Sequence, residues 1–168
     1  WDAVSWRPDH LADRLAFGLT HFDELCSGAP EGFGSNFARE LNRQARHLFR
    51  LGEIGRAEAD NFRLWRGAII AALHLPGFRR RLPEAIKRLE VAASEQILSD
   101  GGHFARSPQA HLDALAALVQ TRAVLFAARV ETPERLQITI DRMAPMLRAY
   151  CHADGGLALF NGAHENNK

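Results

Sequence analysis

Three side chains that could bind an anion or transfer a proton lie close together in SDGGHFARSPQAH, residues 99–111. They are His103, Arg106 and His111. An imidazole titrates near neutral pH, and a guanidinium fork matches a carboxylate or a phosphate. On spacing alone, a loop histidine is most often simply exposed, and an arginine beside a helix often only stabilises the helix end. The segment therefore suggests an anion or proton-transfer site without establishing one.

Two helices have to position this segment. Asp100-Gly101-Gly102 is typical of a helix end, because glycine accepts the left-handed conformation found there. Ser107-Pro108 predicts the start of the next helix, with a capping hydroxyl followed by proline in the first turn. Amide groups at that start would favour a nearby anion. We therefore expect the predicted site on a loop at one end of a helical hairpin, with His111 one turn into the second helix.

Apolar residues recur at helical spacing in six stretches, and the sequence predicts an all-α fold of antiparallel hairpins. Period-two alternation is scarce, and only GGLALFNG, residues 155–162, could pair as an extended segment. Pro145 predicts a kink or an early end in the last helix. The expected helices run from Pro8 to about Gly28, Ser35 to Gly52, Arg56 to Leu75, Leu82 to Ile97, Pro108 to Phe126 and Pro133 to Tyr150.

The composition is that of one globular domain: 168 residues, 46% of them hydrophobic and 24% charged. A net charge of +1 gives no strong field for nucleic acid or an anionic membrane. The longest strongly apolar run, residues 67–73, is too short for a membrane span. Cys26 and Cys151 permit one disulfide but define no framework. Because the chain begins at Trp1, we expect a processed piece, and periplasmic and cytoplasmic locations both stay open.

No motif for a metal, a cofactor or a nucleotide is present, so we expect none of these ligands. Trp65 could stack on a sugar ring, although a tryptophan at helical spacing is more often a core residue. His47 and His74 fit ordinary helix histidines better than ligands. Arg79-Arg80-Arg81 fits a solvated helix turn better than a polyanion site.

EQILSDGGHFARSP, residues 95–108, resembles a segment of the heparinase II/III-like family, in which Gln-Ile-x-x-Asp-Gly-(Gly/Ser)-His precedes a helix start. Residues 67–90 and 140–163 are similar to the same family, so the resemblance spans most of the chain from about Asn42 onward. It implies an incomplete (α/α) toroid of about six helices. It also implies that residues 1–168 are a single helical domain of a longer chain whose C-terminal β-sandwich is absent.

The resemblance further implies a polysaccharide lyase that cleaves a uronic-acid-containing glycan by β-elimination. The partners would be an acidic polysaccharide or oligosaccharide and the protein's own β-sandwich. A base removes the C5 proton, an acid protonates the leaving oxygen, and cationic groups meet the carboxylate. His103 and His111 would be catalytic. The residues expected to bind substrate are Arg106, Gly102, Trp65, Asn61 and Asn161.

Two positions depart from the family pattern. Ala105 stands where relatives carry glutamate, and Ala110 stands where they carry a proton-transferring tyrosine. Tyr150, the only tyrosine, belongs to another helix. Two alternatives therefore remain: a non-catalytic module that binds an acidic glycan or the cell envelope, and a structural helical interaction domain.

Overall fold

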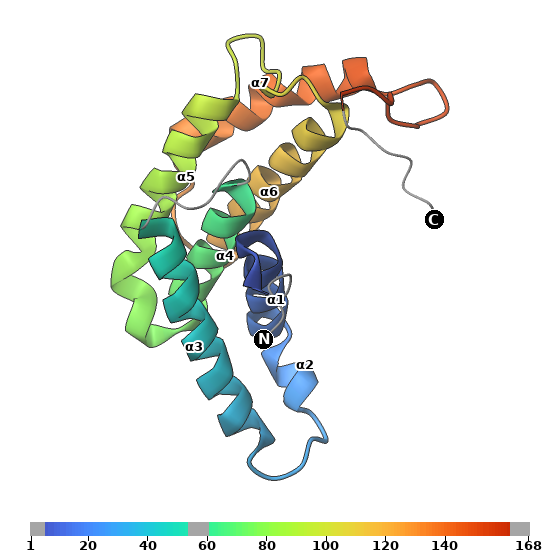
Figure 1. Ribbon diagram of the computed structural model, residues 1–168. Coiled ribbons are helices and arrows are strands. Elements are labelled where there is room, and N and C mark those ends of the chain that lie inside the picture. Colours follow the sequence, from blue (N-terminus) through green and yellow to red (C-terminus); the bar gives the residue numbers. More distant parts are fainter. Residues whose placement is uncertain (1–5, 54–60, 162–168) are drawn as a thin grey trace. The chain divides into compact units, whose positions relative to one another are not determined.

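The computed structural model describes residues 6–53 and 61–161, and the chain divides into two compact units, Trp1–Leu89 and Glu90–Lys168. In the described residues, seven α-helices and one 3-10 helix form the regular structure, and two isolated bridges are the only β pairing (Figure 1). The predicted all-α class is confirmed. The single-domain organisation and the β-sandwich stay predictions.

The first unit is built around α1, which packs against both α3 and α4. Its elements are α1 (Pro8–Thr20), α2 (Phe22–Cys26), α3 (Phe33–Glu53), α4 (Asn61–His74), the 3-10 helix η2 (Pro76–Arg81) and the start of α5 (Leu82–Gln96). Leu11 and Leu15, one turn apart on α1, are fully buried. α1 and α3 run antiparallel, with Arg14 Nε donating to Gln44 Oε1 at 3.3 Å (Figure 1). α1 approaches α4 closely, because a Cβ at Gly67 would lie 2.8 Å from that of Ala12.

The helix ends of this unit differ in detail from those expected. The first helix breaks at His21, so α2 is separate from α1. The second begins at Phe33, ahead of Ser35, whose hydroxyl donates to the Gly32 carbonyl at 2.9 Å rather than capping the helix. The expected start of the third helix at Arg56 lies outside the described residues. These helix ends depend on local hydrogen bonds, which the spacing of apolar residues does not predict.

The second unit contains the end of α5 and an antiparallel hairpin of α6 (Pro108–Ala127) and α7 (Glu134–Tyr150). Ser107 caps α6 as predicted, accepting from the Ala110 N–H. α6 is long and apolar enough to cross a membrane by length and composition alone. It packs on α7 and buries Leu118 and Leu125 completely, while 33% of the apolar stretch is buried in all.

α7 contains Pro145 without ending there. The helix continues to Tyr150, so the early end that was one of the two predicted outcomes does not occur. Pro145 is exposed, on the side of the helix away from fully buried Met143. The missing N–H of the proline therefore leaves the apolar contact with α6 in place.

Candidate functional site

Residues 97–104, called the first turn below, carry the centre of the predicted site. An antiparallel bridge joins Ile97 to His103. Gly101 has a φ of 83°, in the left-handed region that favours glycine, and a Cβ there would overlap the carbonyl oxygen of Arg142 in α7. Asp100-Gly101-Gly102 therefore shapes a bridged turn, whereas the sequence predicted a helix end. α5 has already ended at Gln96.

His103 is buried inside the first turn with an exposed fraction of 5%. Its Nδ1 accepts from the Ala105 N–H at 3.3 Å, so the proton lies on Nε2, which is 3.3 Å from Gln96 Oε1. Burial lowers the pKa of His103, and the neighbouring His111 lowers it further. Both ring nitrogens are thus engaged by the residues that flank the turn, Gln96 and Ala105, and the neutral imidazole is favoured.

His111 is completely buried on α6. Its Nε2 donates to the Met143 carbonyl of α7 at 3.1 Å, and its ring lies edge-on to Tyr150 with centroids 5.4 Å apart. Burial lowers the pKa of His111, and the bond to the carbonyl opposes that effect. Nδ1 is left as an acceptor with no partner among the described residues. The residue joins the two helices of the hairpin.

Arg106 lies at the surface and is paired with Asp100. Nη1 donates to Asp100 Oδ2 at 2.6 Å, with about half of each side chain exposed. This bond raises the pKa of Arg106 and lowers that of Asp100, and a bond to Tyr150 contributes to the rise. A φ of 50° places the Arg106 backbone in the left-handed region. An incoming anion would have to compete with the Asp100 carboxylate for the Arg106 guanidinium.

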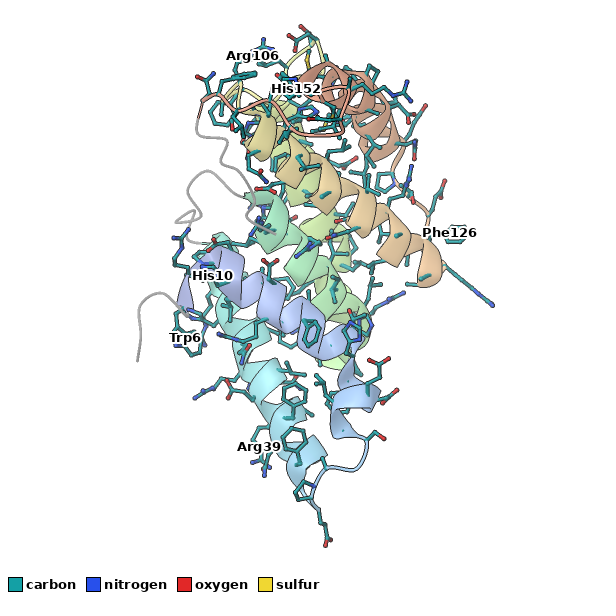
Figure 2. The ribbon with its side chains drawn as sticks, turned by 90° about the vertical axis from the view of Figure 1, so that its right-hand side faces the viewer. Trp6, His10, Arg39, Arg106, Phe126 and His152 are labelled. Carbon is teal, nitrogen blue, oxygen red and sulfur yellow. The ribbon has the colours of Figure 1, made fainter. Side chains whose placement is uncertain are left out.

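Five of the predicted site residues belong to the second unit. Gly102 is buried, and its N–H donates to Asp100 Oδ1 at 2.9 Å. Asn161 Nδ2 donates to the Arg106 carbonyl at 3.1 Å, which ties the C-terminal described segment to residues of the predicted site. Figure 2 shows Arg106 and His152 near the same end of the hairpin. The five are Gly102, His103, Arg106, His111 and Asn161.

Trp65 and Asn61 belong to the first unit. Trp65 is 8% exposed and packs against Gly52, as a core tryptophan does. With Phe49 and Arg81 it lines a shallow cleft in that unit. Asn61 begins α4, and its side chain lies outside the described residues. Within the described part of the chain, no group of three or more His, Cys, Asp or Glu side chains is placed to hold a metal ion.

The sequence analysis missed a second turn of the same kind. Residues 151–158, called the second turn below, carry Asp154-Gly155-Gly156 just after α7 and are bridged from Cys151 to Leu157. The signal was available, because Asp-Gly-Gly recurs 54 residues after Asp100. The sequence analysis expected only a short extended pairing in residues 155–162, which overlaps the second half of this turn.

No protein-family model matches the chain, and no solved structure matches it. The chain is 31% identical over 164 residues to FtsZ-localized protein C of Caulobacter vibrioides (strain NA1000 / CB15N). The similarity covers 96% of this chain and 28% of that protein. The chain therefore spans less than a third of the length of this relative.

This similarity corrects the functional interpretation. The assignment to the heparinase II/III-like family was wrong, and so were the polysaccharide-lyase activity and the acidic-polysaccharide partner that it implied. The motif that carried the resemblance has a structural explanation. Asp-Gly-Gly recurs in the second turn with Leu157 in place of the histidine, so its aspartate and first glycine are explained by turn geometry.

Proposed function

We propose that this chain is a helical interaction domain that helps to place a longer protein with FtsZ at the division site. The similarity to FtsZ-localized protein C over 96% of the chain carries this proposal. The local geometry agrees with a structural role for the predicted catalytic groups, since His103 and His111 are buried and bonded within the second unit. The incomplete toroid stays a proposal of ours, supported by the antiparallel α6–α7 hairpin.

A row of arginines on α3 is the surface that we assign to the partner. Arg39, Arg43, Arg46 and Arg50 follow one another at steps of one helical turn, and all four are exposed. The row is about 16 Å long at the rise of an α-helix. The opposite face of α3 buries Leu41, Ala45 and Leu48 against the unit. The helix is thus fixed by its apolar side and presents the arginines outward.

The charges in this row are only partly neutralised within the chain. Arg39 donates to the Asn36 amide oxygen at 3.1 Å, and Arg43 pairs with Glu40 at 3.0 Å. Arg46 and Arg50 have no ion pair or hydrogen bond with any described residue. A carboxylate-rich segment of a partner protein would pair with such guanidinium groups. We therefore assign an acidic protein segment to this face.

A fluorescent fusion of the chain in Caulobacter vibrioides tests the proposal. We expect the fusion to coincide with tagged FtsZ at midcell. Exchanging Arg46 and Arg50 for glutamate should lower the coincident fraction several-fold, because two favourable contacts become repulsive. The matched control exchanges exposed Arg79 and Arg80 of η2 for glutamate and changes the net charge equally. A diffuse unmodified fusion would contradict the function, and an equal loss in both variants would contradict the assigned surface.

A further inference from the structure

The two turns of the second unit share one hydrogen-bond pattern. In each, the aspartate Oδ1 accepts from the N–H of the second glycine at 2.9 Å, and the first glycine has a φ of 83°. In each, an antiparallel bridge closes the turn. In the first turn the Leu98 N–H donates to the Gly102 carbonyl, and the Phe104 N–H donates to the Gln96 carbonyl. In the second turn the corresponding bonds run from the His152 N–H to the Gly156 carbonyl and from the Ala158 N–H to the Tyr150 carbonyl. The agreement defines a repeated element made of a helix and a bridged turn.

The helices that lead into the two turns agree in register as well. α5 and α7 carry apolar residues at positions that correspond after a shift of 54 residues. The pairs are Leu82 and Leu136, Ile86 and Ile140, Leu89 and Met143, and Ala93 and Leu147. The first turn thus ends one helix–turn element and the second turn ends another.

The first turn is covered by the helix of the following element. Gly101 lies directly against the Arg142 carbonyl of α7, and both glycines of the turn are buried. His103, at the closing bridge, is 5% exposed. α7 therefore covers the first turn through a close contact between two backbones, which Gly101 permits because it has no Cβ and accepts a left-handed φ.

The second turn has no such cover among the described residues. All residues from 151 to 156 are exposed, and a Cβ at Gly155 would meet nothing within 4 Å. Leu159 and Phe160 immediately follow the turn and are 52% and 44% exposed. These two apolar side chains stand where the first turn has Ala105 and Arg106. The second turn is therefore bare and has two exposed apolar side chains beside it, whereas the first turn exposes one, Phe104 at 50%.

We propose that the second turn is the docking surface for a third helix–turn element of the same polypeptide. Its helix would present a backbone carbonyl to Gly155, as α7 presents that of Arg142 to Gly101, and would cover Leu159 and Phe160. The relative has room for such an element, since this chain corresponds to only 28% of its length. The inference does not depend on association with FtsZ.

The alkylation rate of the Cys151 thiol measures directly whether another element covers the second turn. Cys151 is exposed at the closing bridge of the second turn, whereas Cys26 is half-buried in the first unit and serves as an internal reference. Peptide-resolved mass spectrometry would follow both thiols in the 168-residue chain and in the longer polypeptide that the proposal requires. We expect Cys151 to react at least tenfold more slowly in the whole polypeptide, with Cys26 unchanged, and the His152 and Ala158 amides to exchange more slowly there.

Two variants keep the test specific. Leu159→Asp should restore fast alkylation of Cys151 in the whole polypeptide, because a charge would oppose the apolar contact. Ile138→Asp on α7, at a residue of equal exposure, should leave Cys151 protected. Equal Cys151 rates in the two proteins would overturn the proposal. Protection that grows with the concentration of the 168-residue chain alone would identify a second copy as the occupant and would also overturn it.

Discussion

The first and second turns have the same backbone and different surroundings. Both are bridged Asp-Gly-Gly turns that follow a helix, but residues 101–103 are buried, while Gly155 and Gly156 are exposed. The hydrogen-bond pattern is therefore local and follows from the aspartate and the two glycines. Burial is imposed from outside, by the helix that packs over the first turn. The comparison separates what a turn motif encodes from what its neighbours add.

Replacing the first glycine of each turn gives the largest expected difference. In either turn, alanine would be held at a positive φ, at a cost of about 1–2 kcal/mol. Gly101→Ala would also force a Cβ onto the Arg142 carbonyl, which adds about 1–3 kcal/mol as overpacking does. Gly155→Ala meets open space. Urea unfolding of the two variants should therefore show a clearly larger loss of stability for Gly101→Ala.

The same pair of variants tests whether the buried turn is more constrained than the exposed one. Equal losses of stability would mean that Arg142 yields without cost and that the buried turn is not more constrained than the bare one. A far larger loss for Gly155→Ala would mean that the bare turn carries contacts beyond those described. Circular dichroism of both variants checks that the helices are retained.

Acidification should weaken the first turn more than the second. Burial lowers the pKa of His103 in the folded chain below its ordinary value of about 6.5. As the pH falls through that value, the unfolded chain takes up a proton that the folded chain refuses, so stability falls until the folded pKa is reached. The second turn has Leu157 at the equivalent place. Asp100 does not share this response. The Arg106 guanidinium lowers the pKa of its carboxyl, so this group stays ionised while His103 titrates.

Hydrogen exchange at individual amides measures this effect. Between about pH 7.5 and pH 5, protection factors of the Leu98 and Phe104 amides should fall more than those of the His152 and Ala158 amides. His103→Leu should remove a large part of the difference, while the contribution of His111 remains. An unchanged pH response in that variant would show that His103 is not the group that titrates.

The smallest expected effect concerns the surface pair of the first turn. Asp100→Asn keeps an acceptor for the Gly102 N–H but removes the charge that faces Arg106. We expect a slight drop in melting temperature at low salt that disappears near 1 M salt, where the Debye length is about 3 Å. Asp154→Asn in the second turn accepts from Gly156 in the same way and serves as the control. A salt-independent drop would point to altered turn geometry instead.

The helices and the start of α6 could be predicted from the sequence because their causes are local. Apolar spacing predicted which stretches are helical, although it placed Phe126 of α6 in the core and that side chain is 82% exposed. Ser107-Pro108 predicted a cap that the structure confirms. The environment of His103 could not be predicted, since its burial accompanies packing of the turn against α7, a helix about 40 residues later. The functional interpretation failed for a related reason. In the Asp-Gly-Gly-His segment the aspartate and the first glycine are explained by turn geometry, so the segment carries little information about chemistry.

The close approach of α1 and α4 constrains how this unit can change over evolution. Ala12 and Gly67 share one volume, because a Cβ on residue 67 would lie 2.8 Å from the Ala12 Cβ and 3.1 Å from its carbonyl oxygen. A larger side chain at either position would push the two helix axes apart and open gaps around neighbouring leucines. Positions 12 and 67 should therefore covary among homologues, with their combined side-chain size held small.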